Sequence, residues 1–208
     1  QAAIRTLDQN SGLIAPRLYE QIREHFIQEV ISYGDSKVLP FVRIESVHLG
    51  ERTGYPRKTL YEAIPSLHQI RRFIFHGFTK ACHECYSFDS GTERNFAQIL
   101  EQDSEVLTWL RPAAMQFNIH WGRDSRRYEP DFVVETTDCI YLVETKASKE
   151  LSNEEVLAKA EAARQYCSLA TDYTTKHGGK PWHYLLVSHL DIEPTFSFKY
   201  VCELSKSI

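Results

Sequence analysis

Hydrophobic residues in the first half of this chain recur with the spacing of helices. Four apolar residues recur every four positions after Pro16, which suits the first turn of a helix. They are Leu18, Ile22, Phe26 and Val30. The same kind of spacing predicts a second helix over residues 65–78. Both predicted helices have an apolar face and no recognisable chemistry. We therefore predict a helical N-terminal region over residues 1–85.

The pattern changes from about residue 87 onward. A capping box at Ser90–Glu93 predicts a helix that continues through the apolar residues as far as 110. Strand-like runs cover residues 115–121, 128–135, 140–146 and 182–188. A second capping box predicts a helix over residues 152–170, and the tail over 196–204 is compatible with a strand. This α-β-β-β-α-β order predicts an α/β domain over residues 86–208, in which helices sandwich a sheet.

Ionisable residues stand at the ends of two predicted strands, among apolar neighbours. Asp131 lies near the start of one apolar run, and Glu144 and Lys146 end the next. A hairpin in which Glu135 pairs with Ile140 would place Asp131 opposite Glu144, with their Cβ atoms about 4.5–5.5 Å apart. A slip of one residue would move Asp131 to the other face of the sheet.

Two carboxylates this close repel each other, and a divalent cation between them would resolve the conflict. Asp131, Glu144 and the backbone carbonyl of Thr145 are all oxygen ligands, which suit Mg²⁺. A bound metal lowers the pKa of a water, and Lys146 could orient that water or neutralise the charge on a transferring phosphate. The alternative is an exposed ion pair between Asp131 and Lys146 at the end of a sheet.

Three arginines lie in the turn before the second predicted strand: Arg123, Arg126 and Arg127. The planar guanidinium group matches the oxygens of a phosphate, so these residues are candidates for contact with DNA. The alternative is surface pairing with Asp124 and Glu129.

Composition narrows the class of protein. The 208 residues are 42% hydrophobic and 25% charged, typical of a globular protein. We expect a cytoplasmic protein with no membrane partner, because no apolar run reaches the roughly 18 residues of a membrane span and no signal peptide is visible. The net charge of −4 argues against a broad electrostatic coating of nucleic acid. Cys82-His83-Glu84-Cys85 has the spacing of half a zinc site, but reduced thiols are the simpler interpretation.

Residues 88–97, 128–134 and 141–146 together resemble the C-terminal nuclease region of type III restriction enzyme R subunits and related helicase–nucleases, within the PD-(D/E)xK superfamily. The resemblance covers residues 70–190 or so. It implies a restriction-endonuclease-like core with a mixed sheet, cleavage of double-stranded DNA, and Mg²⁺ as the cofactor, with Mn²⁺ as a substitute.

The resemblance also implies site residues and partners. An acidic residue on the helix before the sheet often completes the metal site, which makes Glu93 a candidate catalytic residue and ligand. Lys159 on the later helix is a candidate for DNA contact, whereas Gln165 fits solvated surface better. ATP would act only through an upstream helicase motor, because this chain has no phosphate loop. The start at Gln1 agrees with a fragment, whose residues 1–85 would bridge to that motor.

A methyltransferase and recognition subunit is an implied partner. Two other functions stay open from the sequence. One is a catalytically inactive docking or DNA-binding module, and the other is a stand-alone repair or structure-specific nuclease.

Overall fold

The computed structural model describes residues 16–17, 54–113, 116–122 and 126–205. The chain divides into two units between residues 39 and 40, and residues 54–205 belong to the second. Residues 16 and 17 are helical. The predicted helix over 18–30 lies outside the described residues.

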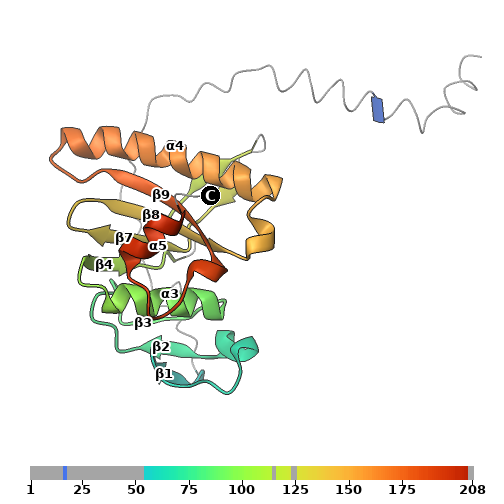
Figure 1. The fold of residues 1–208 in the computed structure, drawn as a ribbon, viewed down its shortest axis with the longest axis vertical. Coiled ribbons are helices and arrows are strands. Elements are labelled where there is room, and N and C mark those ends of the chain that lie inside the picture. Colours follow the sequence, from blue (N-terminus) through green and yellow to red (C-terminus); the bar gives the residue numbers. More distant parts are fainter. Residues whose placement is uncertain (1–15, 18–53, 114–115, 123–125, 206–208) are drawn as a thin grey trace, which may run out of the picture. The chain divides into compact units, whose positions relative to one another are not determined.

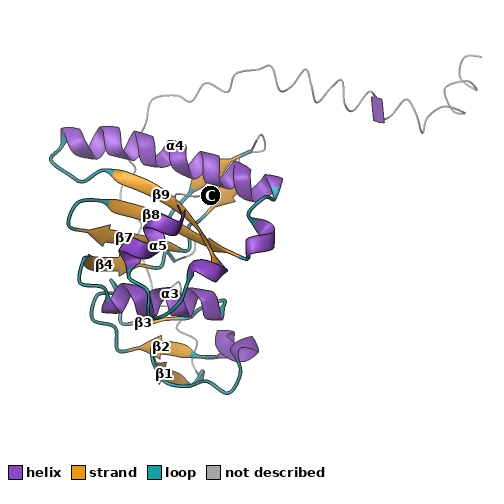
Figure 2. Cartoon of the chain, in the orientation of Figure 1, coloured by secondary structure: helices purple, strands orange, loops and turns teal. Residues whose placement is uncertain are grey.

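A four-stranded mixed sheet forms the centre of the second unit (Figures 1 and 2). Its strands, in spatial order, are β4 (Val106–Leu110), β7 (Phe132–Thr136), β8 (Ile140–Lys146) and β9 (Trp182–Ser188). The first three strands pair antiparallel, whereas β9 is parallel to β8. A parallel partner needs a crossover connection, and the helix between β8 and β9 supplies it.

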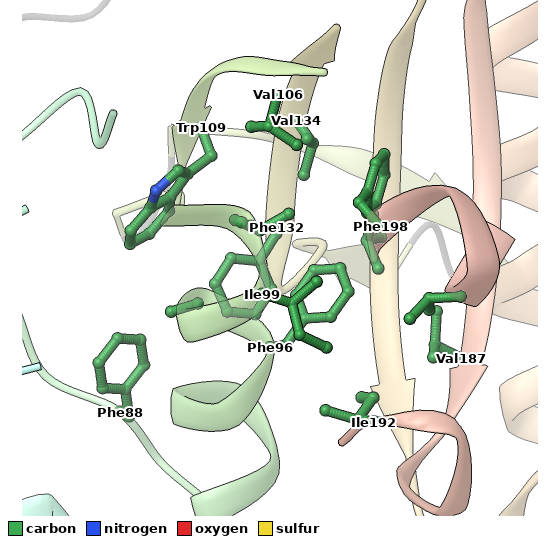
Figure 3. Packing of buried hydrophobic residues seen from close by; sticks show 14 of the residues in the cluster. Phe88, Phe96, Ile99, Val106, Trp109, Phe132, Val134, Val187, Ile192 and Phe198 are labelled. Atoms are coloured by element: carbon green, nitrogen blue, oxygen red, sulfur yellow. The ribbon is translucent and has the colours of Figure 1, made fainter. Parts of the chain in front are cut away.

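Helices cover both faces of this sheet (Figure 1). They are α3 (Gly91–Gln102), α4 (Glu154–Lys176) and α5 (Phe198–Ser205). The larger core packs Phe96 of α3 and Phe198 of α5 against Phe132 of β7, and Figure 3 shows these rings together. The architecture is therefore the predicted α/β fold of restriction-endonuclease-like type, with a mixed sheet between helices.

The opposite face of the sheet has its own apolar cluster. Leu142 of β8 packs there against Ala163 and Cys167 of α4. A two-stranded hairpin, β5 (Ile119–Trp121) and β6 (Arg126–Tyr128), adds to the same cluster. Because side chains alternate along a strand, Glu144 and Lys146 share this face with Leu142.

A small three-stranded sheet precedes the central one. Its strands are β1 (Arg57–Thr59), β2 (Ile74–His76) and β3 (Cys85–Tyr86). The predicted helix over 65–78 is wrong: a short 3₁₀ helix (Leu67–Arg72) is followed by β2. Pairing with both neighbouring strands buries Ile74 and Phe75, which outweighs their helical spacing.

The predicted boundary near residue 85 falls at the start of β3. Phe75 of the small sheet contacts Phe88, with 5.4 Å between ring centroids, so this sheet shares the larger core. The role of residues 1–85 as a bridge to a motor stays a prediction.

The helix predicted to run from the first capping box to residue 110 is too long. α3 ends at Gln102, where the backbone N–H of Asp103 closes the last turn on Ile99. Residues 106–110 form β4 instead, and Val106 and Trp109 bury their β-branched and aromatic side chains on the core face.

The remaining elements differ from prediction mainly in extent. The predicted strand over 128–135 is split into β6 and β7, because Pro130 between them has no N–H for a ladder. The strand over 115–121 shortens to β5, and the tail over 196–204 forms α5 rather than a strand. α4 runs from Glu154 to Lys176, and its N-cap is Asn153, one residue after the predicted cap Ser152. The side chain of Asn153 accepts a hydrogen bond from the N–H of Glu155.

Candidate active site

The predicted hairpin register is confirmed. Phe132 of β7 lies opposite Val143 of β8, and Glu135 lies opposite Ile140. Continued by one residue, this register brings Asp131 to the end of β8. There Asp131 Oδ2 accepts hydrogen bonds from the backbone N–H and the hydroxyl of Thr145, both at 2.8 Å. These bonds fix the Asp131 carboxylate against the strand that carries Glu144.

Glu144 is buried, with 5% of its surface exposed, and both carboxylate oxygens have partners. Lys146 Nζ lies 2.5 Å from Glu144 Oε1. The hydroxyl of Tyr128, from β6, donates to Glu144 Oε2 across 2.9 Å. The structure therefore brings together the three predicted residues Asp131, Glu144 and Lys146. In place of the alternative, an exposed ion pair between Asp131 and Lys146, Lys146 pairs with the buried Glu144.

Burial beside a second carboxylate disfavours the charged form of Asp131. Burial, reinforced by the charge of Glu144, raises the pKa of Asp131 to about 6, although the hydrogen bonds from Thr145 oppose the shift. Burial opposes the charge of Lys146 as well, but the Glu144 carboxylate outweighs it and raises the pKa of the ammonium group. Lys146 is therefore a fixed positive charge in the resting site.

Glu93 lies at the start of α3, where it completes the predicted capping box. Its backbone N–H donates to Ser90 Oγ at 3.1 Å, and its carboxylate accepts from the Ser90 hydroxyl and from the N–H of Asp89. Arg111 Nη2 donates to Glu93 Oε2 at 2.9 Å. Burial raises the pKa of Glu93 despite this arginine, and the charge of Asp131 adds to the shift. The charges of Glu93 and Asp131 therefore interact, while Ser90 and Arg111 bind the Glu93 carboxylate.

Arg111 was not anticipated from the sequence. It follows β4 and bridges two carboxylates, with Nη2 2.6 Å from Asp89 Oδ2 as well as 2.9 Å from Glu93. Its Nη1 donates to the carbonyl of Ser87. No spacing marks Arg111 in the sequence, because it lies in a segment whose apolar pattern predicted a helix.

Two tyrosines beside Glu144 were also missed. Tyr128 is hydrogen-bonded to both Glu144 and Tyr184 of β9. Burial and the charge of Glu144 raise the pKa of both phenols, so they remain protonated. The available signal was position: Tyr128 is the first residue of the predicted strand over 128–135, just before the Pro130–Asp131 pair.

The donor set fits a Mg²⁺ ion held by few protein ligands. Within residues 16–17, 54–113, 116–122 and 126–205, no group of three or more His, Cys, Asp and Glu side chains is placed to hold a metal. Asp131 and Glu144 are nevertheless adjacent carboxylates, and burial disfavours the charge of Asp131, which a cation would offset. Mg²⁺ is commonly bound through one or two carboxylates, with water and substrate phosphate as the other ligands. Asp131, Glu144 and the Thr145 carbonyl suit this mode, whereas Glu93 is engaged with Arg111.

The candidate DNA-contacting residues lie around α4 and the β5–β6 hairpin. Arg123 is outside the described residues. The Arg126 guanidinium stacks over Trp121 of β5, 4.2 Å from the ring centroid, and Lys159 Nζ lies 5.0 Å from the same centroid. Arg127 is exposed on β6.

The segment from Cys82 to Cys85 carries two of the five cysteines. Cys82 is exposed and Cys85 is buried, and no disulfide joins any of the cysteines at 82, 85, 139, 167 and 202. Arg57 Nη2 lies 2.6 Å from Cys85 Sγ. In the part of the chain that the structure describes, no group of three or more His, Cys, Asp and Glu side chains is placed to hold a metal, and the interpretation as reduced thiols stays a prediction.

No helix among the described residues is both long enough and apolar enough to cross a membrane. A comparison with curated proteins found no match. A comparison with protein families matches residues 96–171 to the family described as TnsA-like endonuclease N terminal. The matched residues run from α3 into α4 and include Asp131, Glu144 and Lys146, while Glu93 lies just before them. The match supports the nuclease superfamily and gives no specific support to the type III subunit. Residues 96–171 thus resemble a TnsA-like endonuclease, on a fold of the restriction-endonuclease-like PD-(D/E)xK type.

Proposed function

We propose that this chain is a Mg²⁺-dependent DNA endonuclease that hydrolyses phosphodiester bonds at the Asp131–Glu144–Lys146 site. The observation that carries the proposal is the convergence of these three side chains at the end of β8. The match to an endonuclease family over the same residues supports the reaction class.

Each residue has a role that follows from its environment. Asp131 and Glu144, with the Thr145 carbonyl, would hold the metal. When bound, Mg²⁺ supplies a water of lowered pKa and positive charge at the phosphate. The ammonium group of Lys146 stabilises the negative charge that develops on the phosphate and orients the attacking water through a hydrogen bond.

Glu93 acts at the edge of this site in the proposal. Its negative charge adds to that of Asp131, and the ion pair with Arg111 holds the Glu93 carboxylate in place. Contact with the metal would then run through a water rather than a direct bond, because the Glu93 oxygens already accept three kinds of donor.

The cellular context belongs to the proposal as well. An upstream ATP-driven helicase and a methyltransferase or recognition subunit rest on the resemblance of residues 88–97, 128–134 and 141–146 to helicase–nucleases. A TnsA-like nuclease is the competing context, favoured by the family match. Cleavage by a longer protein that carries the upstream motor, at a rate that does not change with ATP, would contradict dependence on that motor.

An Asp131→Asn variant distinguishes an enzyme from an inactive docking module. The change keeps the acceptor for Thr145 but removes the negative charge that binds the metal. The proposal predicts that cleavage of duplex DNA falls by at least about 100-fold while the fold is retained. Cleavage at the parent rate in this variant would contradict the assigned site.

A further inference from the structure

A cluster of positive charges lies beside the active site, around the N-terminal turns of α4. Arg126 and Lys159 come from β6 and α4 but contact the same indole, that of Trp121, whose surface is only 6% exposed. An aromatic face holds cations in place and leaves their charge available. The two side chains are therefore ordered before any ligand arrives.

The carboxylate of Glu155 faces this cluster. Glu155 Oε1 lies 2.7 Å from Lys159 Nζ, and 53% of the Glu155 side chain is exposed. The hydrogen bond and charge of Lys159 lower the pKa of Glu155, and the charges of Arg126 and Lys146 add to the effect. Glu155 is thus attracted by the charges of Lys159, Arg126 and the active-site residue Lys146.

An exposed ion pair between residues four apart on a helix contributes little stability, so a better anion can displace it. A phosphodiester offers several oxygens to the planar fork of an arginine and to a lysine ammonium. Arg126 lies on β6 two residues before Tyr128, whose hydroxyl donates to Glu144, so the same strand carries the cluster and reaches the active site.

We propose that Arg126 and Lys159 bind a backbone phosphate of duplex DNA next to the scissile one, and that Glu155 occupies this place in the free protein as a displaceable anion. This inference rests on the proposed nuclease function and specifies where its substrate is held. Glu155 lowers the affinity for duplex DNA of any sequence, since every duplex must first displace it.

The test is binding of a short fluorescent duplex in EDTA, where no cleavage occurs, by the parent chain and by Glu155→Gln. The variant should bind about three- to fivefold more tightly at low salt, because the competing carboxylate is gone. Glu161→Gln is the matched control. Glu161 lies on the same helix and pairs with Arg164 at 3.6 Å, and the Arg164 guanidinium lies over the ring of Tyr184. The control should change affinity by less than about twofold.

Arg126→Gln and Lys159→Gln supply the second arm. Each should weaken binding and reduce the slope of log affinity against log salt by about 0.9, the effect of one lost phosphate contact. Thermal melting verifies that each variant is folded.

Equal binding by Glu155→Gln and Glu161→Gln, or weaker binding by Glu155→Gln, would overturn the phosphate site. If the parent still cut plasmid DNA in that case, the nuclease function would stand without it. A parent that neither bound nor cut duplex DNA would overturn both.

Discussion

Tyr128 donates its phenolic hydrogen to Glu144 Oε2 across 2.9 Å, while Lys146 holds the other oxygen of the same carboxylate. The tyrosine comes from the hairpin and the glutamate from the central sheet. Tyr128 therefore fixes the orientation of a proposed metal ligand from outside the strand that carries it. Loss of a group that orients a ligand in this way typically lowers metal affinity by about 10- to 100-fold.

Replacement of Tyr128 by phenylalanine removes only the hydroxyl and keeps the ring in the cluster with Ile119 and Leu142. We expect cleavage to fall about tenfold and the Mg²⁺ concentration for half-maximal activity to rise by a similar factor. The measurement is cleavage rate against Mg²⁺ concentration. Tyr200→Phe, at an exposed position of α5, is the control. Unchanged Mg²⁺ dependence in Tyr128→Phe would show that the hydrogen bond does not position Glu144.

The raised pKa of Asp131 predicts a pH-dependent stability in the absence of metal. Its folded-state pKa of about 6 exceeds the usual 3.8, so between these values the folded protein binds more protons than the unfolded chain. The contribution of Asp131 to the free energy of unfolding is therefore most favourable below about pH 4 and becomes less favourable as the pH rises toward 6. At pH 7 the ionised carboxylate costs about 1–3 kcal/mol.

Asp131→Asn should remove that cost. Urea unfolding in EDTA at pH 7 should find the variant about 1–3 kcal/mol more stable than the parent, and the difference should shrink near pH 4. A variant that is less stable than the parent at pH 7 would contradict strained burial of the Asp131 charge.

Mg²⁺ should reverse the order of these two proteins. A ligand that binds only the folded state stabilises it by an amount that grows with its concentration. We expect Mg²⁺ to raise the melting temperature of the parent by several degrees and to leave Asp131→Asn and Glu144→Gln nearly unchanged. Equal shifts in all three proteins would place any metal elsewhere.

Arg111 should be important for folding as well as for the site. Arg111→Gln leaves the buried Glu93 without its cationic partner, and we expect a loss of about 2–3 kcal/mol in the free energy of unfolding. The double variant Arg111→Gln with Glu93→Gln removes both charges and should recover a large part of that loss. Chemical unfolding of the four proteins of this cycle gives the coupling directly. Additive losses would mean that the two residues do not act as a pair.

The parts of the site that depend on local pattern could be predicted from the sequence. The alternation of apolar residues and the short turn after Glu135 fix the register, and that register alone places Asp131 beside Glu144. The helix α4 between β8 and β9 followed from the order of strand-like and helix-like runs, whereas the mixed sheet was implied by the resemblance to PD-(D/E)xK nucleases.

The parts that depend on distant contacts could not be predicted. Leu107 and Leu110 continue the helical spacing of α3, and only pairing of β4 with β7 makes that segment a strand. Arg111 reaches Glu93 from the far end of β4, and Tyr184 reaches Tyr128 from β9. Such pairs are set by packing of the sheet, which the local pattern does not encode.

Nicking and linearisation of supercoiled plasmid by this chain with Mg²⁺ or Mn²⁺, beside Lys146→Ala, tests whether the Asp131–Glu144–Lys146 site cuts DNA. Lys159→Ala, on the neighbouring helix, is compared at the same protein concentration. We expect cleavage by the parent, only weakened cleavage by Lys159→Ala, and none by Lys146→Ala. Equal cleavage by the parent and Lys146→Ala would contradict the assignment of the active site.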